Sequence, residues 1–134
     1  KKVIELGCGH GFPGIFALQQ GAEVDFQDYN PEVIDEVLVP NILINFPSAL
    51  TSARPPRYFC GDWAGLPSVA FEPSVKDTDG AKPKNSAIKY DLVLTAETIY
   101  SPESIGRLLD CIERLLQPGG VAYVAAKSYY FGVG

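Results

Sequence analysis

The residues of this sequence best suited to chemistry stand at its start, where three glycines alternate with other residues. Glu5 is followed by Gly7, Gly9 and Gly11. Glycine permits backbone angles that a Cβ forbids, and it leaves bare N–H groups against which a ligand can lie, beside the N-terminus of a following helix. This spacing predicts a loop that binds a nucleotide-like ligand. The G-x-G-x-x-G fingerprint of dinucleotide-binding domains is disfavoured, because Phe12 fills the position of its third glycine.

Cys8 and His10 lie between these glycines. A cysteine and a histidine can act as a nucleophile and its base, but neighbouring loop residues seldom point at each other. We therefore expect Cys8 and His10 to contact the ligand mainly through their backbones. The other cysteines, Cys60 and Cys111, are far apart, and His10 is the single histidine, so neither a metal site nor a disulfide framework is predicted. The odd number of cysteines favours reduced thiols.

A carboxylate and an amide follow the second predicted strand. Asp28 ends that strand about twenty positions after Gly7, where an acidic residue typically binds the two hydroxyls of a ribose. Asn30 precedes Pro31 and is a good helix N-cap, and it joins Asp28 among the candidate ligand contacts. The alternative for Asp28 is a helix cap or a solvated carboxylate in a turn.

A second cluster, Gly61-Asp62-Trp63, follows a predicted strand at residues 57–60. In a parallel sheet the ligand lies across the carboxyl ends of several strands, so this cluster should share a site with the glycines. Asp62 can accept a hydrogen bond from an adenine amino group, and the Trp63 indole can stack on the ring. The alternative for Trp63 is an aromatic side chain of the core or one that anchors a loop.

Apolar segments predict five strands that alternate with helices. The strands are expected at residues 3–6, 24–27, 57–60, 90–96 and 121–126, and the helices at 14–20, 33–39 and 102–116. Pro40 should kink or end the second helix. This alternation predicts an α/β fold with a doubly wound, mostly parallel sheet and a site at the carboxyl edge of its strands. Residues 64–89 are predicted to form a long mobile loop.

The last predicted helix should bury one apolar face. The residues expected on that face are Ile105, Leu108, Leu109, Ile112, Leu115 and Leu116. Residues 117–120, Gln-Pro-Gly-Gly, should stop the helix before the fifth strand begins.

Length and charge limit the class of protein. The 134 residues suit one domain, spanning residues 1–134, but fall short of the roughly 150 expected of a full α/β enzyme domain. The sequence also begins within a strand signal, so we expect the fold to be truncated at both ends. The net charge of −5 and the scattered basic residues disfavour direct binding of nucleic acid, and no apolar run reaches the roughly 20 residues of a membrane span. A cytoplasmic and/or nuclear location is expected.

The leading glutamate with its three alternating glycines resembles the first motif of the class I, seven-strand methyltransferases. The turn at residues 115–120 is similar to the one that ends their fourth helix, and the order of the predicted elements agrees from the first strand to the fifth. The resemblance implies a Rossmann-like class I methyltransferase fold with S-adenosyl-L-methionine as cofactor. It would place Glu5 near the cationic amino end of the cofactor, the glycine loop at its methionine part and Asp28 at its ribose, with Ala96 also in the cofactor site.

Four segments resemble the protein-histidine N-methyltransferase family more narrowly: residues 26–30, 40–41, 94–100 and 130–134. This resemblance implies methyl transfer to a histidine side chain of a protein, with a large-subunit ribosomal protein as the family's known substrate. It would place Glu97 and Tyr100 in the acceptor pocket. Glu97, Thr98 or Tyr100 could then hold the hydrogen of the imidazole nitrogen that does not react.

Several alternatives remain open at this point. Related protein-lysine methyltransferases carry D-x-x-Y where this chain has Glu97-x-x-Tyr100, which weakens a lysine acceptor without excluding it. Glu97 could instead cap the next helix, and Tyr100 could be a packing residue. A module that binds the cofactor without catalysis is a further alternative, as is a nicotinamide-dependent oxidoreductase, which Phe12 disfavours.

Overall fold

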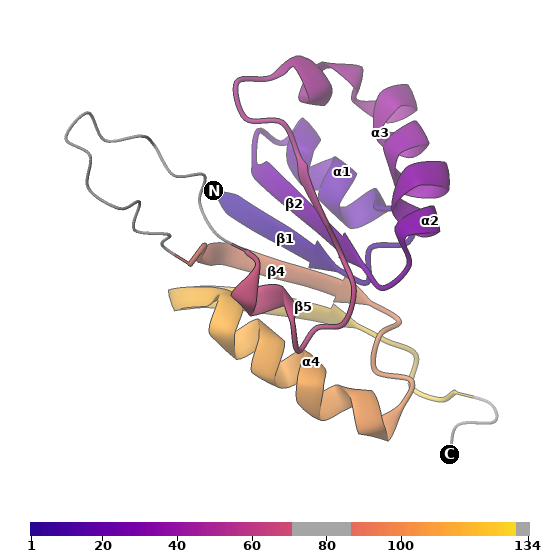
Figure 1. The fold of residues 1–134 in the computed structure, drawn as a ribbon, viewed down its shortest axis with the longest axis vertical. Coiled ribbons are helices and arrows are strands. Elements are labelled where there is room, and N and C mark those ends of the chain that lie inside the picture. Colours follow the sequence, from indigo (N-terminus) through magenta and orange to yellow (C-terminus); the bar gives the residue numbers. More distant parts are fainter. Residues whose placement is uncertain (71–86, 131–134) are drawn as a thin grey trace.

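The computed structural model describes residues 1–70 and 87–130. In that part of the chain five strands form one parallel sheet, flanked by helices on both faces (Figure 1). The strands are β1 (Lys2–Leu6), β2 (Glu23–Asp28), β3 (Arg57–Cys60), β4 (Tyr90–Ala96) and β5 (Leu116–Ala125). The predicted α/β fold with a doubly wound parallel sheet is therefore confirmed.

The central strand β1 organises the sheet, whose order is β3-β2-β1-β4-β5. Successive side chains of a strand point to opposite faces, and Val3 accordingly packs in one hydrophobic cluster while Ile4 packs in the other. The chain steps outward from β1 through β2 to β3, then crosses back to β4 on the other side of β1. The order of the strands thus reverses between β1 and β4, and ligands of open α/β sheets bind at such a point.

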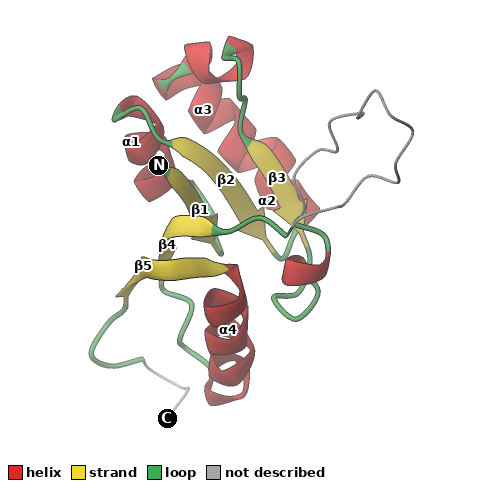
Figure 2. Ribbon diagram, turned by 90° about the vertical axis from the view of Figure 1, so that its left-hand side faces the viewer, coloured by secondary structure: helices red, strands yellow, loops and turns green. Residues whose placement is uncertain are grey.

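The helices divide between the two faces of the sheet (Figure 2). Two of them, α1 (Phe12–Gln19) and α3 (Val39–Asn45), pack on the face that contains Val3 through Ile15, Leu18 and Ile42, and the short α2 (Pro31–Val33) lies on the same side. The fourth helix, α4 (Pro102–Leu115), covers the other face through Leu108, Cys111, Ile112 and Leu115. Both faces of β1 are thereby removed from water, as expected for a parallel sheet.

Of the two outcomes predicted at Pro40, a kink or an end of the second helix, the end is wrong. Between α2 and α3 the chain forms a π-helical turn, Ile34–Leu38, and the Val39 N–H bonds to the Ile34 carbonyl. This wider turn ends just before Pro40, which occupies the first turn of α3, where its missing N–H costs little. The helical segment therefore continues to Asn45.

Three further details of the fold differ from the prediction: one buried face and the starts of two elements. Leu109, expected on the buried face of α4, is 56% exposed, and Cys111 is buried in the core instead. β5 begins at Leu116 rather than at residue 121, because Leu116 already pairs with Tyr90 ahead of an irregularity in the register. The first helix begins at Phe12 rather than at residue 14.

The segment after Trp63 is described only in part. Leu66–Ser68 form a 3-10 turn, as Pro47–Thr51 do earlier in the chain. The rest of the loop predicted at residues 64–89 lies largely outside the described residues, which also exclude residues 131–134 of the last family motif. Among the helices of the described ranges, none has the length and apolar character needed to cross a membrane.

Candidate active site

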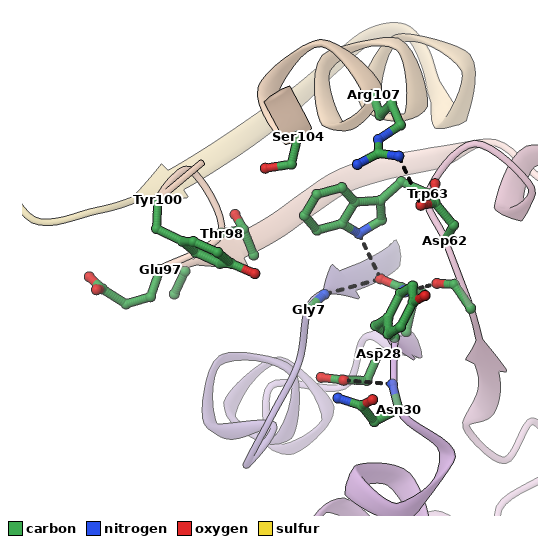
Figure 3. A pocket seen from close by; sticks show the side chains of 14 residues that line it. Gly7, Asp28, Asn30, Asp62, Trp63, Glu97, Thr98, Tyr100, Ser104 and Arg107 are labelled. Atoms are coloured by element: carbon green, nitrogen blue, oxygen red, sulfur yellow. Dashed lines mark hydrogen bonds and ion pairs between the residues drawn. The ribbon is translucent and has the colours of Figure 1, made fainter. Parts of the chain in front are cut away.

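A pocket of about 500 Å³ opens at the carboxyl ends of the strands (Figure 3). Both halves of the sheet contribute to it: Gly7 follows β1, Asp28 ends β2, Gly61 follows β3 and Ala96 ends β4. The other lining residues are Gln27, Tyr29, Asn30, Asp62, Trp63, Glu97, Thr98, Tyr100, Ser104 and Arg107. The pocket thus lies at the edge of the sheet where the sequence predicted a site.

The glycine loop adopts left-handed backbone angles, with φ of 60° at Gly7, 50° at Gly9 and 73° at Gly11. A Cβ at Gly7 would lie 2.6 Å from Cγ2 of Thr98, and one at Gly11 would lie 2.2 Å from Cδ1 of Leu38. At Gly9 no atom lies within 4 Å of the position a Cβ would take. A Cβ at Gly7 or Gly11 would therefore have to displace a side chain as well as adopt a strained φ, whereas the space over Gly9 is open.

Asp28, which is 9% exposed, connects the end of β2 to the glycine loop. Its Oδ2 accepts a hydrogen bond from the Gly9 N–H at 3.0 Å, and its Oδ1 accepts one from the Asn30 N–H at 3.1 Å. A carboxylate oxygen accepts more than one hydrogen bond, so Asp28 keeps capacity for donors in the pocket. Asn30 occupies the N-cap position of α2, but its side chain makes no capping hydrogen bond.

Glu5 lies behind the glycine loop and does not line the pocket described above. It is 3% exposed, and its Oε2 accepts a hydrogen bond from the Gly14 N–H at 2.8 Å. Burial raises the pKa of this carboxyl to about 7, and the hydrogen bond from Gly14 opposes part of that increase. Glu5 therefore supports the start of α1, and its contact with a cofactor amino group stays a prediction.

Cys8 and His10 have different surroundings. The Cys8 thiol is buried, and burial raises its pKa well above the ordinary value, with nearby carboxylates adding to the effect. A nucleophilic cysteine needs a lowered pKa, so Cys8 is unsuited to that role. His10 is exposed, stacks on Phe12 at 5.8 Å between ring centroids, and accepts at its carbonyl a hydrogen bond of 2.9 Å from the Asn41 side chain. The described residues contain no group of three or more side chains able to hold a metal ion.

Trp63 has a packing role and also a place in the pocket, and its stacking on an adenine ring stays a prediction. The indole packs against the hydrophobic cluster under α4 and also lines the pocket, and its Nε1 donates to Oε1 of Gln27 at 2.9 Å. Asp62 beside it accepts a hydrogen bond from the Ala64 N–H at 2.8 Å and forms an ion pair with Arg107 at 3.4 Å. The contact of Asp62 with an adenine amino group stays a prediction.

Glu97, Thr98 and Tyr100 come from the segment after β4 and lie together, away from Asp28 and Asn30 (Figure 3). Glu97 has a φ of 59°, the one positive value found at a non-glycine residue in the described ranges. Its N–H donates to the Ala125 carbonyl at 2.8 Å, and its carboxylate lies 3.4 Å from the Lys127 ammonium. Backbone strain of this kind costs about 1 kcal/mol or more and is common at functional sites.

Thr98 belongs to a directed chain of hydrogen bonds. The Thr95 hydroxyl donates to the Leu6 carbonyl at 2.9 Å, and the Thr95 and Thr98 hydroxyl oxygens are 2.7 Å apart. Because a hydroxyl has one hydrogen and Thr95 uses it on Leu6, Thr98 must be the donor in the second bond. The buried Thr98 oxygen can then only accept hydrogen bonds from other groups.

Nine of the predicted site residues meet in the pocket: Gly7, Asp28, Asn30, Gly61, Asp62, Trp63, Ala96, Glu97 and Tyr100. Those that do not line it are Glu5, Cys8, Gly9, His10 and Gly11, which belong to the loop or lie behind it. Four lining residues were not predicted: Gln27, Tyr29, Ser104 and Arg107. A polar residue inside a buried strand could have signalled Gln27, and two polar residues at helical spacing could have signalled Ser104 and Arg107.

Comparison with known proteins identifies the family. The profile of the methyltransferase domain family matches residues 1–128. This chain belongs to that family. The methyltransferase domain is 40% identical over 134 residues to the Histidine protein methyltransferase 1 homolog of Dictyostelium discoideum. That alignment covers 100% of this chain and 37% of the relative. It is 32% identical over 127 residues to the EEF1A lysine methyltransferase 3 of Mus musculus, which covers 95% of this chain and 45% of that protein.

The methyltransferase domain spans less than half the length of either relative. A crystal structure of a TehB-like SAM-dependent methyltransferase from Corynebacterium glutamicum has the same fold, with a TM-score of 0.59 at 22% identity. The match covers 99% of this chain and 56% of that one. The predicted Rossmann-like class I methyltransferase fold is thus confirmed.

Proposed function

We propose that this methyltransferase domain binds S-adenosyl-L-methionine in the pocket and transfers its methyl group to a histidine side chain of a protein. The observation that supports this function is the joint pocket, in which the ends of β1, β2 and β3 face the segment after β4. Similarity to a histidine protein methyltransferase over the whole chain favours a histidine acceptor. A lysine acceptor is the second candidate, because a lysine methyltransferase is also similar.

The sequence resemblance supports a large-subunit ribosomal protein as the substrate. The odd number of cysteines favours reduced thiols, and methylation would take place in the cytoplasm and/or the nucleus. Direct binding of nucleic acid or of a membrane is not part of the proposed function.

The pocket residues fit the cofactor. A volume of about 500 Å³ lies within the range of small-molecule sites. Gly9 does not line the pocket, but the space over it is open, so the loop beside the pocket would let a ligand lie against backbone. Asp28 keeps acceptor capacity for ribose hydroxyls. Trp63 offers an aromatic surface for adenine. When bound, the cofactor supplies a sulfonium methyl group that a nitrogen lone pair can attack.

Positioning is the main task that this chemistry leaves to the protein. Asp28 would hold the ribose, the glycine loop would carry the methionine part, and Asp62 would accept from the adenine amino group. Glu5 would hold the loop from behind through Gly14. Correct alignment of two reacting groups can lower a barrier by several kcal/mol, and the reduction reaches about 7–11 kcal/mol in favourable cases.

The acceptor side suits imidazole because little proton transfer is needed. Imidazole, with an ordinary pKa of about 6.5, is mostly neutral at pH 7, whereas deprotonating an ordinary lysine at that pH costs roughly 4–5 kcal/mol. A neutral imidazole still carries one N–H, and a hydrogen-bond acceptor at that nitrogen leaves the other lone pair free to attack. Glu97, Thr98 and Tyr100 line the pocket, and their side-chain oxygens are the candidate acceptors.

The test is to incubate the full-length enzyme with methyl-labelled cofactor and an extract from cells that lack it, and to map the methyl group by fragment-ion mass spectrometry. We expect single methylation of histidine at a rate that rises between about pH 6 and 7.5 and is then flat. Glu97→Ala and Tyr100→Phe should lose most of the activity, whereas Leu109→Ala, on the exposed face of α4, should keep it. Methyl on lysine, or a rate that still climbs towards about pH 10, would favour the second candidate. Cofactor binding without any methylated product would indicate a binding module.

A further inference from the structure

Gln27 is a buried amide at the carboxyl end of β2, and at 1% exposure it has almost no contact with solvent. Its Oε1 accepts hydrogen bonds from the Gly7 N–H at 3.1 Å and from the Trp63 indole N–H at 2.9 Å. Its Nε2 donates to the Gly61 carbonyl at 2.8 Å. The dashed lines from Gly7 and from the indole in Figure 3 converge on this one amide oxygen. One side chain thus connects the segments that follow β1 and β3.

The three bonds determine the orientation of the amide. An amide oxygen has two lone pairs, and here both receive a donor. The reversed orientation would direct an NH₂ group at two N–H donors and the oxygen at the Gly61 carbonyl, so all three contacts would become repulsive. The amide therefore holds the indole and the Gly7 peptide at a fixed separation across the floor of the pocket.

We propose that Gln27 is a positioning residue for the cofactor, which acts by holding the Trp63 indole and the Gly7 peptide in the arrangement that receives an adenosyl group. This inference rests on the proposed function, because it assigns the aromatic part of the pocket to the adenine of the cofactor. Gln27 supports affinity for the cofactor. It takes no part in the attack of the acceptor nitrogen, because the acceptor side of the pocket is formed by the residues after β4.

The single tryptophan of the sequence makes the proposal measurable. In Gln27→Met, a side chain of similar length replaces the amide and removes its hydrogen bonds. We expect the emission maximum of Trp63 to change and the affinity for S-adenosylhomocysteine to fall about ten- to hundredfold, as for unpaired buried donors. The turnover number at saturating cofactor should stay within about threefold, so the loss appears in KM. Gln20→Met, at the exposed end of α1, is the matched control.

A double-mutant cycle separates positioning of the indole from a general loss of structure. Trp63→Phe keeps an aromatic ring and removes the N–H that Gln27 accepts. Gln27→Met should therefore reduce affinity by a smaller factor in the Trp63→Phe background than in the wild type. Equal factors in both backgrounds would overturn the link to Trp63.

Gln27→Glu keeps the proposal testable if Gln27→Met folds poorly. A protonated carboxyl reproduces the amide, because its C=O accepts from Gly7 and Trp63 and its O–H donates to the Gly61 carbonyl, whereas an ionised carboxyl cannot donate. Its charge would also lie beside Asp28. Affinity should match the wild type at about pH 6 and fall about tenfold below it at about pH 8. Glu5 titrates in both proteins, so comparison at each pH removes its contribution.

The outcomes distinguish this inference from the proposed function. A wild-type protein that does not bind S-adenosylhomocysteine would refute the function itself. Wild-type binding together with unchanged affinity and unchanged Trp63 emission in Gln27→Met would refute the role of Gln27 alone.

Discussion

Asp25 and Asp28 are buried carboxylates on the same strand, yet their partners differ. Asp25, at 6% exposure, accepts hydrogen bonds from the Arg57 guanidinium at 3.1 and 2.6 Å and from the Tyr90 hydroxyl at 2.7 Å. Asp28, at 9% exposure, instead accepts from the backbone N–H groups of Gly9 and Asn30. Asp25 thereby connects the strands β2, β3 and β4 away from the pocket, whereas Asp28 lines the pocket.

The difference shows how one strand serves both stability and binding. Burying a charge is costly unless it is paired, and Asp25 meets this requirement with a cation and a hydroxyl. Asp28 is held by N–H groups that stabilise its charge without neutralising it, so further donors can still bind. Removal of Asp25 should therefore mainly affect folding, and removal of Asp28 should mainly affect the ligand.

The largest effect should follow Asp25→Ala, which takes away the charge opposite Arg57. We expect the free energy of unfolding to fall by about 2–4 kcal/mol, below the cost for a fully buried pair, because the Arg57 side chain is 33% exposed. Urea denaturation measures this change. In calorimetric titration, the folded variant should bind S-adenosylhomocysteine within about twofold of wild type, as expected for a separate site. A variant of unchanged stability but weakened binding would break the comparison.

Asp28→Ala should show the reverse pattern. Removing the ribose acceptor should weaken S-adenosylhomocysteine binding by about 1–3 kcal/mol, the usual cost of leaving buried hydroxyls unpaired. Calorimetric titration at constant ionic strength tests this loss. Asp110→Ala, which removes the same charge from the exposed side of α4, is the control and should bind normally. Unchanged affinity in Asp28→Ala would contradict the ribose assignment.

Glu5 adds a buried carboxyl whose effect depends on pH. Its pKa is raised from 4.5 to about 7 in the folded chain, so the folded state keeps the proton at pH values where the unfolded state has lost it. The free energy of unfolding should therefore fall as the pH rises from about 4.5 to about 7 and then level off, by roughly 3 kcal/mol in all.

Glu5→Gln keeps an acceptor for the Gly14 N–H and cannot ionise. Urea denaturation at several pH values between about 5 and 8 should show that this variant lacks the decline of the wild type. An equal decline in both proteins would assign the pH dependence to another group.

The smallest effect should come from Glu97, a site carboxylate with left-handed backbone angles. Glu97→Gly relieves the strain and should raise the free energy of unfolding by up to about 1 kcal/mol, while methyl transfer falls. Glu97→Ala is the matched control, because it also removes the carboxylate but keeps the Cβ and the strain. Thermal denaturation measures the stability of both variants. Equal stability of Glu97→Gly and Glu97→Ala would show that the strain at Glu97 costs little.

Much of the fold could be predicted from local pattern. The alternation of apolar strands with amphipathic helices, and the glycines that follow β1, placed the site at the carboxyl edge, because hydrophobic period and turn chemistry depend on neighbouring residues. The sequence pattern predicted side-chain burial and helix geometry less accurately where tertiary packing determines them. Leu109 has the period of a buried residue and is exposed, and the π-helical turn before Pro40 has no local signal.

The sequence by itself determined the order of strands and helices and the motifs that collect at one edge of the sheet. Only the tertiary structure decided which carboxylate of β2 is neutralised and which side chain connects the loops. Tyr90 is 65 positions from Asp25, and Trp63 is 36 positions from Gln27. Partners at such separations meet only once the register of the parallel strands is set, and that register depends on burying both faces of β1 at the same time.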